Sequence, residues 1–306
     1  MAPLEDVGHL RHAILGAGGV GGLIGACLAR SGDSVTLVLR PESLAQYPAQ
    51  LHVESAFGNF SVPVSRAAEV PPVDVLWIAV KATQLESALS AFTKPESVGA
   101  IVPLLNGVDH LAALRAKYGS GRVIAATIAV ETERVAPGHI VHRSAFARLS
   151  VSSSGKKLLG TTLDHLQKMG FECRFVDDEP TLMWSKLVFL AAFALTTTAS
   201  GKTTGEILAD PEWRQLVLSC IREGSAVAVA EGAKIDADAI IAYVMKMPGN
   251  MRSSMQKDVE RGNAPELDAI AGPILRGGER HGIEVPITKQ LVAAVERRVG
   301  SPHAVV

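Results

Sequence analysis

The chain has 306 residues, of which 47% are hydrophobic and 20% are charged. This composition excludes a disordered protein, and the length exceeds what one hydrophobic core usually holds, so we expect a globular chain of two domains. The formal net charge of -1 gives no overall attraction to nucleic acid or to an anionic membrane, so the expected partner is a small molecule.

The cysteines and histidines do not predict a disulfide framework or a metal site. The 3 cysteines are widely spaced and form no CxxC pair, which is typical of reduced thiols in the cytoplasm. His139 and His142 follow a Pro-Gly turn in a strand-like run, where their spacing directs them to opposite faces. This spacing predicts no metal site. The N-terminal residues carry acids and no long apolar stretch, so we expect no signal peptide and a cytoplasmic location.

The first predicted unit is a strand, a glycine turn and a helix. Apolar residues 13–15 lead into the turn, where Gly16 allows the tight bend, Gly18 lets a pyrophosphate approach the backbone, and Gly21 lets the helix lie close to the strand. The diphosphate is expected at the helix N-terminus, where free N–H groups and the dipole favour an anion. A purely structural turn is the alternative. The predicted cofactor-binding residues of this turn are Gly16, Ala17, Gly18, Gly19, Val20 and Gly21.

The residue after the second predicted strand indicates which cofactor binds. This strand covers residues 34–39 and is followed by Arg40. An acidic residue there would hold the ribose hydroxyls of NAD, whereas a guanidinium suits the 2′-phosphate of NADP. We therefore predict NADP(H), with an ordinary solvated arginine as the alternative interpretation of Arg40.

Two further apolar runs, residues 73–80 and 100–105, are typical of buried parallel strands and are followed by Lys81 and Asn106. Ligands of open α/β sheets bind outside the carboxyl ends of the strands. Lys81 alone could simply end a strand, and Asn106 with its following glycine could form a turn. Together with Gly16 and Arg40, they predict a polar rim around a bound cofactor.

The remaining pattern predicts the domain boundary. A hairpin is expected around Gly58, and further elements include helices over residues 84–92, 109–118 and 158–169, strands over 122–130 and 147–151, a reversal at Pro137-Gly138, and a strand over 171–176 that closes the sheet. Acidic residues and Pro180 then mark a helix start. We predict an α/β N-terminal Rossmann-type dinucleotide-binding domain over residues 1–178 and an all-α C-terminal domain over 179–306.

The first helix of the second domain carries a lysine among apolar neighbours. Lys186 has Leu182, Phe189 and Leu190 on its own helix face. Desolvation there would lower its pKa and make it a proton donor near neutral pH. The alternative is a lysine whose stem covers apolar surface while its head reaches water. The apolar run 187–195 is shorter than the roughly 20 residues that a membrane span needs, so we expect a buried helix.

Later helices are expected over residues 211–231 and 237–247, with another containing Gly272 and Pro273. Ser254 and Glu266 are polar candidates for a binding site. The alternative for Ser254 is a helix cap, and the alternative for Glu266 is a partner of a helix dipole.

At this point the chain resembles the ketopantoate reductase family, the NADPH-dependent 2-dehydropantoate 2-reductases, over nearly its full length. The resemblance rests on an ordered set of motifs: GAGGVG at 16–21, Arg40, AVK ending at Lys81, LLNG with Asn106, SKL with Lys186, Leu195-Thr196, and SSMQKD followed by ELDAIAG. It implies a Rossmann domain followed by a helical domain, with the active site between them, in a cytoplasmic enzyme of pantothenate biosynthesis that is a monomer or a homodimer.

The resemblance also implies a role for each candidate residue. Lys186 matches the general acid and contacts the substrate, and Asn106 matches an asparagine that contacts both the nicotinamide and the substrate. Lys81 matches a lysine of the cofactor site, and Ser254 matches a serine that holds the substrate carboxylate. Glu266 matches a glutamate that contacts the cofactor and belongs to the catalytic set. The predicted reaction transfers hydride from NADPH and a proton from Lys186 to a 2-oxo acid.

One departure from the family pattern concerns the substrate. The family commonly has asparagines at the fourth and eighth positions after the lysine, and this chain has Leu190 and Ala194 there. Removing such hydrogen-bonding partners usually removes selectivity for a hydroxyl. Thr196, Thr197 and Asn250 are candidates to supply these hydrogen bonds instead, and the sequence does not decide between them. The alternatives are a reductase for a more apolar 2-oxo acid and a non-catalytic NADP-binding module.

Overall fold

The computed structural model describes residues 9–300, which form two compact units. The sheet unit contains the described residues up to 105 together with residues 110–177. The helical unit contains residues 106–109 and the described residues from 178 onward. The N-terminal segment in which no signal peptide is expected lies mostly outside the described residues.

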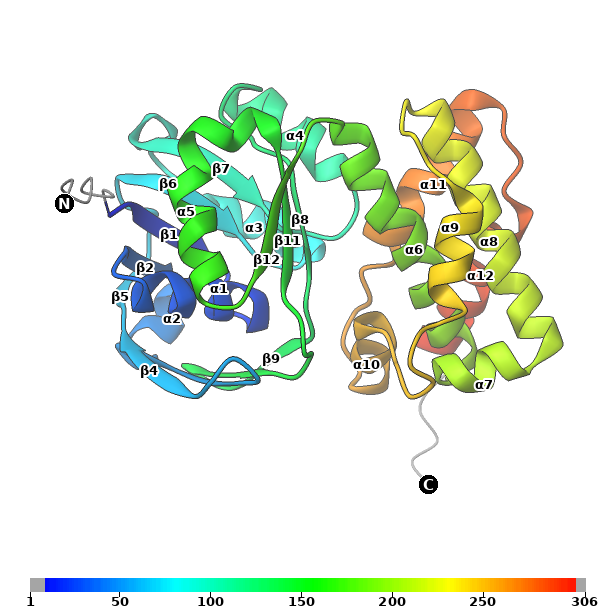
Figure 1. The fold of residues 1–306 in the computed structure, drawn as a ribbon, viewed down its shortest axis with the longest axis horizontal. Coiled ribbons are helices and arrows are strands. Elements are labelled where there is room, and N and C mark those ends of the chain that lie inside the picture. Colours follow the sequence, from blue (N-terminus) through cyan, green and yellow to red (C-terminus); the bar gives the residue numbers. More distant parts are fainter. Residues whose placement is uncertain (1–8, 301–306) are drawn as a thin grey trace, which may run out of the picture. The chain divides into compact units, whose positions relative to one another are not determined.

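The sheet unit is built on a five-stranded parallel sheet in the order β5-β2-β1-β6-β7 (Figure 1). The order changes direction between β1 and β6, and ligands of open α/β sheets bind at the carboxyl ends of the strands beside such a point. Most residues of β1, β6 and β7 are buried, as in strands covered on both faces. The strands are β1 Arg11–Leu15, β2 Ser34–Val38, β5 Ser65–Ala67, β6 Val73–Ile78 and β7 Val98–Pro103.

Helix α1 connects β1 to β2 and contacts two different sheets of this unit. The predicted helix over 84–92 is interrupted, because α3 is flanked by 3₁₀ turns at 82–84 and 89–91. Further 3₁₀ turns cover 95–97 and 153–155. The helices are α1 Gly19–Arg30, α2 Pro41–Leu44, α3 Leu85–Ala88, α4 Asp109–Tyr118 and α5 Lys156–Lys168.

Two smaller sheets complete the sheet unit, in the orders β4-β3-β10-β9 and β12-β11-β8. The predicted hairpin around Gly58 is present as β3 and β4, and the predicted reversal at Pro137-Gly138 joins β9 to β10. The strands are β3 Gln50–Ser55, β4 Phe60–Pro63, β8 Ala126–Ala129, β9 Thr132–Ala136, β10 His139–His142, β11 Arg148–Ser152 and β12 Glu172–Val176.

The last strand of this unit does not close the nucleotide-binding sheet, so that prediction is wrong. Strand β12 pairs in parallel with β11 and extends the three-stranded sheet instead. Helix α5 is the connection between these two strands, and consecutive strands joined by a helix commonly pair with each other.

The helical unit is organised around the long helix α6, which contacts α7, α8, α10, α11 and α12. The Asp178 carboxylate accepts a hydrogen bond from the Thr181 N–H at its start, and Gly201 ends it with a φ of 72°, which suits a glycine C-terminal position. The helices are α6 Glu179–Ser200, α7 Thr204–Ala209, α8 Pro211–Ala230, α9 Ala237–Val244, α10 Ser254–Glu260, α11 Leu267–His281 and α12 Pro286–Gly300.

Among the described residues, α6 is the one helix long and apolar enough to cross a membrane, and 67% of its apolar window is buried within the protein. Val188, Ala191 and Leu195 are fully buried and belong to the hydrophobic core of the helical unit. The apolar character of α6 is therefore explained by its position in this core.

Residues 106–109 pack with the helical unit, although the sequence places them in the first domain. Asn106 donates a hydrogen bond to Glu266, Val108 packs against the core of the helical unit, and Arg276 forms an ion pair with Asp109. A Cβ on Gly107 would collide with the carbonyl oxygen of Ala269. These contacts explain why the segment belongs to the helical unit despite its place in the chain.

Candidate functional site

The glycine turn of the sheet unit has the backbone that a pyrophosphate requires. Gly16 follows β1 with a φ of 106°, a conformation that glycine adopts without strain. A Cβ on Gly21 would collide with the carbonyl oxygen of Gly16, whereas a Cβ on Gly18 would meet nothing within 4 Å. Gly21 therefore permits close packing of helix and strand, and the open side of Gly18 gives a phosphate access to the backbone.

The start of α1 also fits an anion. Gly18 is its N-cap residue and provides no side-chain cap, and no acidic residue lies in the first turn. The N–H groups at a helix N-terminus and the helix dipole attract negative charge. On the other side of the turn, a Cβ on Gly19 would lie 2.6 Å from the carbonyl oxygen of Thr132. Ala17 and Val20 complete this turn, and its residues fit the diphosphate of a dinucleotide.

The two basic candidates of the sheet unit follow strands that flank β1. Arg40 comes after β2, is exposed, and precedes the short helix α2. Lys81 comes after β6, is half-buried, and precedes a 3₁₀ turn. Because all strands of this sheet are parallel, Gly16, Arg40 and Lys81 lie at its carboxyl edge. This is the edge at which open α/β sheets bind their ligands.

In the helical unit, Lys186 lies in the second turn of α6, between the buried residues Trp184 and Leu187. Burial lowers the pKa of the Lys186 amine to about 8, and the nearby negative charge of Glu266 opposes part of this decrease. Desolvation disfavours the charged ammonium, while an opposite charge favours it. The result is an amine that carries a proton at neutral pH and loses it readily, which is the property of a general acid.

Glu266 and Asn106 form a hydrogen-bonded pair beside this lysine. The Asn106 Nδ2 donates to Glu266 Oε2 at 3.0 Å. Glu266 precedes α11 and is buried with 9% of its surface exposed. A buried carboxylate is costly unless it is hydrogen-bonded or near a positive charge, and Glu266 has both. The helical unit therefore contains a proton donor, an amide and a carboxylate as one polar group.

The two serines at the start of α10 have different positions and surroundings. Ser253 is the N-cap: it is buried, its hydroxyl accepts the Gln256 N–H at 3.1 Å, and it accepts a second hydrogen bond from Thr197 at 2.7 Å. Ser254 is exposed and is the first residue of the helix. A helix cap is the alternative role predicted for Ser254, but the neighbouring Ser253 fills that position.

Positions 190 and 194, where the family pattern has asparagines, carry apolar side chains here and also have apolar neighbours. Leu190, about one helical turn beyond Lys186, is half-buried, and Ala194, about two turns beyond it, is buried. On the same helix, the Phe189 and Phe193 rings stack with centroids 5.8 Å apart, and Phe189 meets the edge of Tyr243. This part of α6 therefore offers apolar contacts and no side-chain hydrogen bond.

The two threonines considered as replacements lie within hydrogen-bond distance of backbone carbonyls of their own helix. Thr196 donates to the carbonyl of Ala192 at 2.7 Å, and Thr197 lies 2.8 Å from the carbonyl of Phe193. Both side chains are buried, with at most 1% of their surface exposed. Asn250 is exposed. The threonine hydroxyls thus have partners within the helical unit.

Comparison with known proteins places both units in one family. The family model described as ketopantoate reductase PanE/ApbA matches residues 12–154, and the model of its C terminal part matches residues 180–298. A 2-dehydropantoate 2-reductase of Caulobacter vibrioides is 32% identical over 92% of this chain and 96% of its own length. One from Archaeoglobus fulgidus is 27% identical over 93% of this chain and 96% of its own length.

Solved structures agree on the fold. The crystal structure of a PanE/ApbA family ketopantoate reductase from Ralstonia eutropha JMP134 has a TM-score of 0.83 at 28% identity and covers 94% of this chain and 98% of its own. D-mandelate dehydrogenase, solved with NADH and anilino(oxo)acetate, shares the fold with a TM-score of 0.83 at 22% identity, over 94% of this chain and 98% of its own. The predicted order of a Rossmann-type unit and a helical unit is confirmed. This chain belongs to the ketopantoate reductase family of NAD(P)-dependent oxidoreductases, which act on small molecules.

Proposed function

We propose that this protein uses NADPH to reduce 2-dehydropantoate to pantoate. The observation that carries the proposal is the Lys186 amine, desolvated on α6 and close to the Glu266 carboxylate that Asn106 holds. When bound, the cofactor supplies a hydride to the carbonyl carbon of the substrate. Lys186 Nζ gives its proton to the carbonyl oxygen as negative charge develops there.

The other residues bind and orient the reactants. The Asn106 amide has a second N–H besides the one given to Glu266, and this N–H is available to the substrate. The exposed hydroxyl of Ser254 holds the substrate carboxylate. Glu266 keeps Lys186 protonated through its charge and contacts the cofactor. The glycine turn binds the diphosphate, with Lys81 as a further cofactor contact.

NADPH rather than NADH is proposed because of Arg40. The fold alone does not select the cofactor, since D-mandelate dehydrogenase has the same fold and was solved with NADH. An exposed guanidinium directly after β2 provides a planar set of donors for a 2′-phosphate. An acidic residue, which would bind the ribose hydroxyls of NAD, does not occupy position 40.

A second candidate function is the reduction of a more apolar 2-oxo acid. It is favoured by Leu190 and Ala194 and by the stacked rings of Phe189 and Phe193 on the same helix. These side chains offer no partner for the terminal hydroxyl of 2-dehydropantoate. A site without such a partner does not discriminate strongly between a hydroxylated substrate and its analogue.

An absorbance assay at the nicotinamide band, run with NADPH and NADH in parallel, tests both candidates. The key comparison is kcat/KM for 2-dehydropantoate against 3,3-dimethyl-2-oxobutanoate, which differs only by lacking the hydroxyl. A preference for 2-dehydropantoate by about 10²-fold or more supports the first candidate, and an equal or reversed preference supports the second. Tight NADPH binding with no turnover of any 2-oxo acid would refute both and leave a nucleotide-binding module.

Glu266→Gln is expected to shift the pH dependence of the reaction. Lys186 must be protonated to act, so kcat/KM should fall as the pH rises through the pKa of about 8. Removing the Glu266 charge removes the effect that raises this pKa, so the alkaline limb should move to lower pH. Glutamine retains an oxygen that accepts the Asn106 hydrogen bond, so the shift reports charge rather than a lost contact.

The control is Asn106→Ala, which removes the hydrogen bond and keeps the carboxylate. It should lower kcat/KM and leave the alkaline limb in place. If the profile of Glu266→Gln coincides with that of the wild type, Glu266 does not set the protonation of Lys186.

A further inference from the structure

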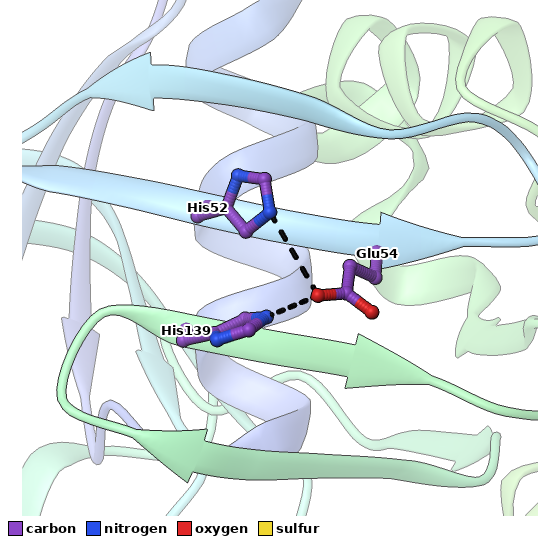
Figure 2. Close-up of side chains that lie close together, drawn as sticks. All are labelled: His52, Glu54 and His139. Atoms are coloured by element: carbon purple, nitrogen blue, oxygen red, sulfur yellow. Dashed lines mark hydrogen bonds and ion pairs between the residues drawn. The ribbon is translucent and has the colours of Figure 1, made fainter.

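Outside the reductase residues, two histidines and a glutamate converge on the sheet β4-β3-β10-β9. Figure 2 shows the rings of His52 and His139 facing the same oxygen of the Glu54 carboxylate. The His139 Nε2 lies 2.7 Å from Glu54 Oε1, and the His52 Nε2 lies 3.9 Å from the same oxygen. One ligand atom from each residue lies within 4.8 Å of the others. The three side chains are named here the His-Glu-His cluster.

Strand pairing brings these residues together from distant parts of the chain. Strand β10 runs parallel to β3, with His139 opposite His52 and Val141 opposite Glu54. In β3, the alternating Leu51 and Val53 are buried, so the residues between them face outward. The cluster therefore lies on the solvent face of the sheet.

The nearby His142 does not join the cluster. Its Nδ1 lies 2.9 Å from the Ser55 hydroxyl and its Nε2 lies 3.1 Å from the Ser144 hydroxyl. His142 is buried, whereas the His139 side chain is 32% exposed. The expectation that these two histidines face apart agrees with this geometry, but the expectation of no metal site rested on this pair and on the cysteines and did not include His52 or Glu54.

We propose that the His-Glu-His cluster binds a divalent transition-metal ion of the zinc type. Ligands at about 2.0–2.1 Å from a tetrahedral ion lie about 3.3 Å from one another, and the two distances to Glu54 Oε1 lie on either side of this value. Two imidazoles and one carboxylate form a ligand set of three protein groups, and the fourth position faces solvent for a water molecule.

A hydrogen bond behind His52 supports its role as a ligand. The His52 Nδ1 lies 2.9 Å from the hydroxyl of Ser61, which is opposite His52 on β4. Metal-binding histidines commonly donate their second ring N–H to such a partner, which fixes the tautomer and leaves the other nitrogen free for the ion. Here that other nitrogen, Nε2, faces Glu54.

The chemistry of the three groups selects the class of ion. Calcium and magnesium take six or more ligands that are mainly oxygens, whereas imidazole nitrogens suit zinc, copper and nickel. An ion at this position would join residue 139 of β10 to residues 52 and 54 of β3. It binds the folded sheet and not the unfolded chain, so it should stabilise the sheet unit.

Calorimetric titration of the full chain with Zn²⁺ tests the proposal. The wild type should bind one Zn²⁺ that the double variant His52→Ala/His139→Ala does not bind. Glu54→Gln should weaken this binding tenfold or more, and Ser61→Ala should weaken it less. Zn²⁺ should raise the Tm of the wild type and leave that of the double variant unchanged. Co²⁺ bound at the same site should give the visible absorption of a four-coordinate ion.

His281→Ala is the matched control, because His281 lies 2.9 Å from Glu231 in a His-Glu pair that no second histidine joins among residues 9–300. It should bind Zn²⁺ as the wild type does. Reductase activity should be unchanged in all these variants, which shows that they are folded. Equal stoichiometry and affinity in the wild type and the double variant, or no Zn²⁺ binding by the wild type, would show that the cluster is only a surface ion pair.

Discussion

Replacing Lys186 with alanine or methionine is expected to lower kcat by about 10²-fold or more, the usual contribution of general acid catalysis. The physical reason is the loss of the amine that gives its proton to the developing alkoxide. Methionine is the more informative substitution, because its unbranched side chain fills apolar surroundings and the half-buried Lys186 has the core residues Trp184 and Leu187 near it along α6. The measurement is NADPH oxidation at saturating substrate.

Two controls separate catalysis from folding and from cofactor binding. Lys289→Met removes an exposed lysine of the same unit, whose side chain is 62% accessible, and it should leave kcat unchanged. NADPH binding by the Lys186 variants, followed by nicotinamide fluorescence, should equal that of the wild type. A wild-type kcat in Lys186→Met would remove this residue from the role of general acid.

Replacing Arg40 with glutamate is expected to lower the ratio of kcat/KM for NADPH to that for NADH by about 10²-fold. Hydrogen bonds to charged groups contribute about 1.5–3 kcal/mol each, or roughly 10–100-fold in affinity. The new carboxylate also repels the 2′-phosphate and suits the ribose hydroxyls of NADH. The effect should appear mainly in KM for NADPH, because the substitution leaves the proton donor unchanged.

The control for this prediction is Arg30→Ala. Arg30 is an exposed arginine at the last position of α1, and its guanidinium lies 4.3 Å from the centre of the Phe60 ring. Arg30→Ala makes the net charge of the sheet unit more negative, as Arg40→Glu does, but it leaves the residues after β2 unchanged. Its cofactor ratio should equal that of the wild type. An unchanged ratio in Arg40→Glu would mean that another residue selects the cofactor.

Features that depend on neighbouring residues in the chain were predictable from the sequence. The glycine turn after β1, the apolar strand β6 and the proline near the start of α6 each have a local physical cause. The pattern around Lys186 also predicts a desolvated amine, because its neighbours on the helix face are apolar. In these cases the short-range pattern and the three-dimensional environment coincide.

Features that depend on pairing between distant segments were not predictable in the same way. Residues 171–176 read correctly as a strand, but the sequence does not say which strand they pair with, and β12 pairs with β11. The His-Glu-His cluster requires the register of β3 against β10. The hydrogen bond between Asn106 and Glu266 joins residues separated by 160 positions, and only the family resemblance suggested that both belong to one site.

The assignment of residues 106–109 to the helical unit has a consequence for chimeric enzymes. A hybrid that joins residues 1–177 of this protein to the C-terminal half of a relative would place a native Asn106 and Asp109 against foreign replacements for Glu266 and Arg276. Such a fusion breaks matched pairs at two points. A hybrid that exchanges this tetrapeptide together with the C-terminal half keeps them, and it should retain the activity of its parents when the simpler fusion does not.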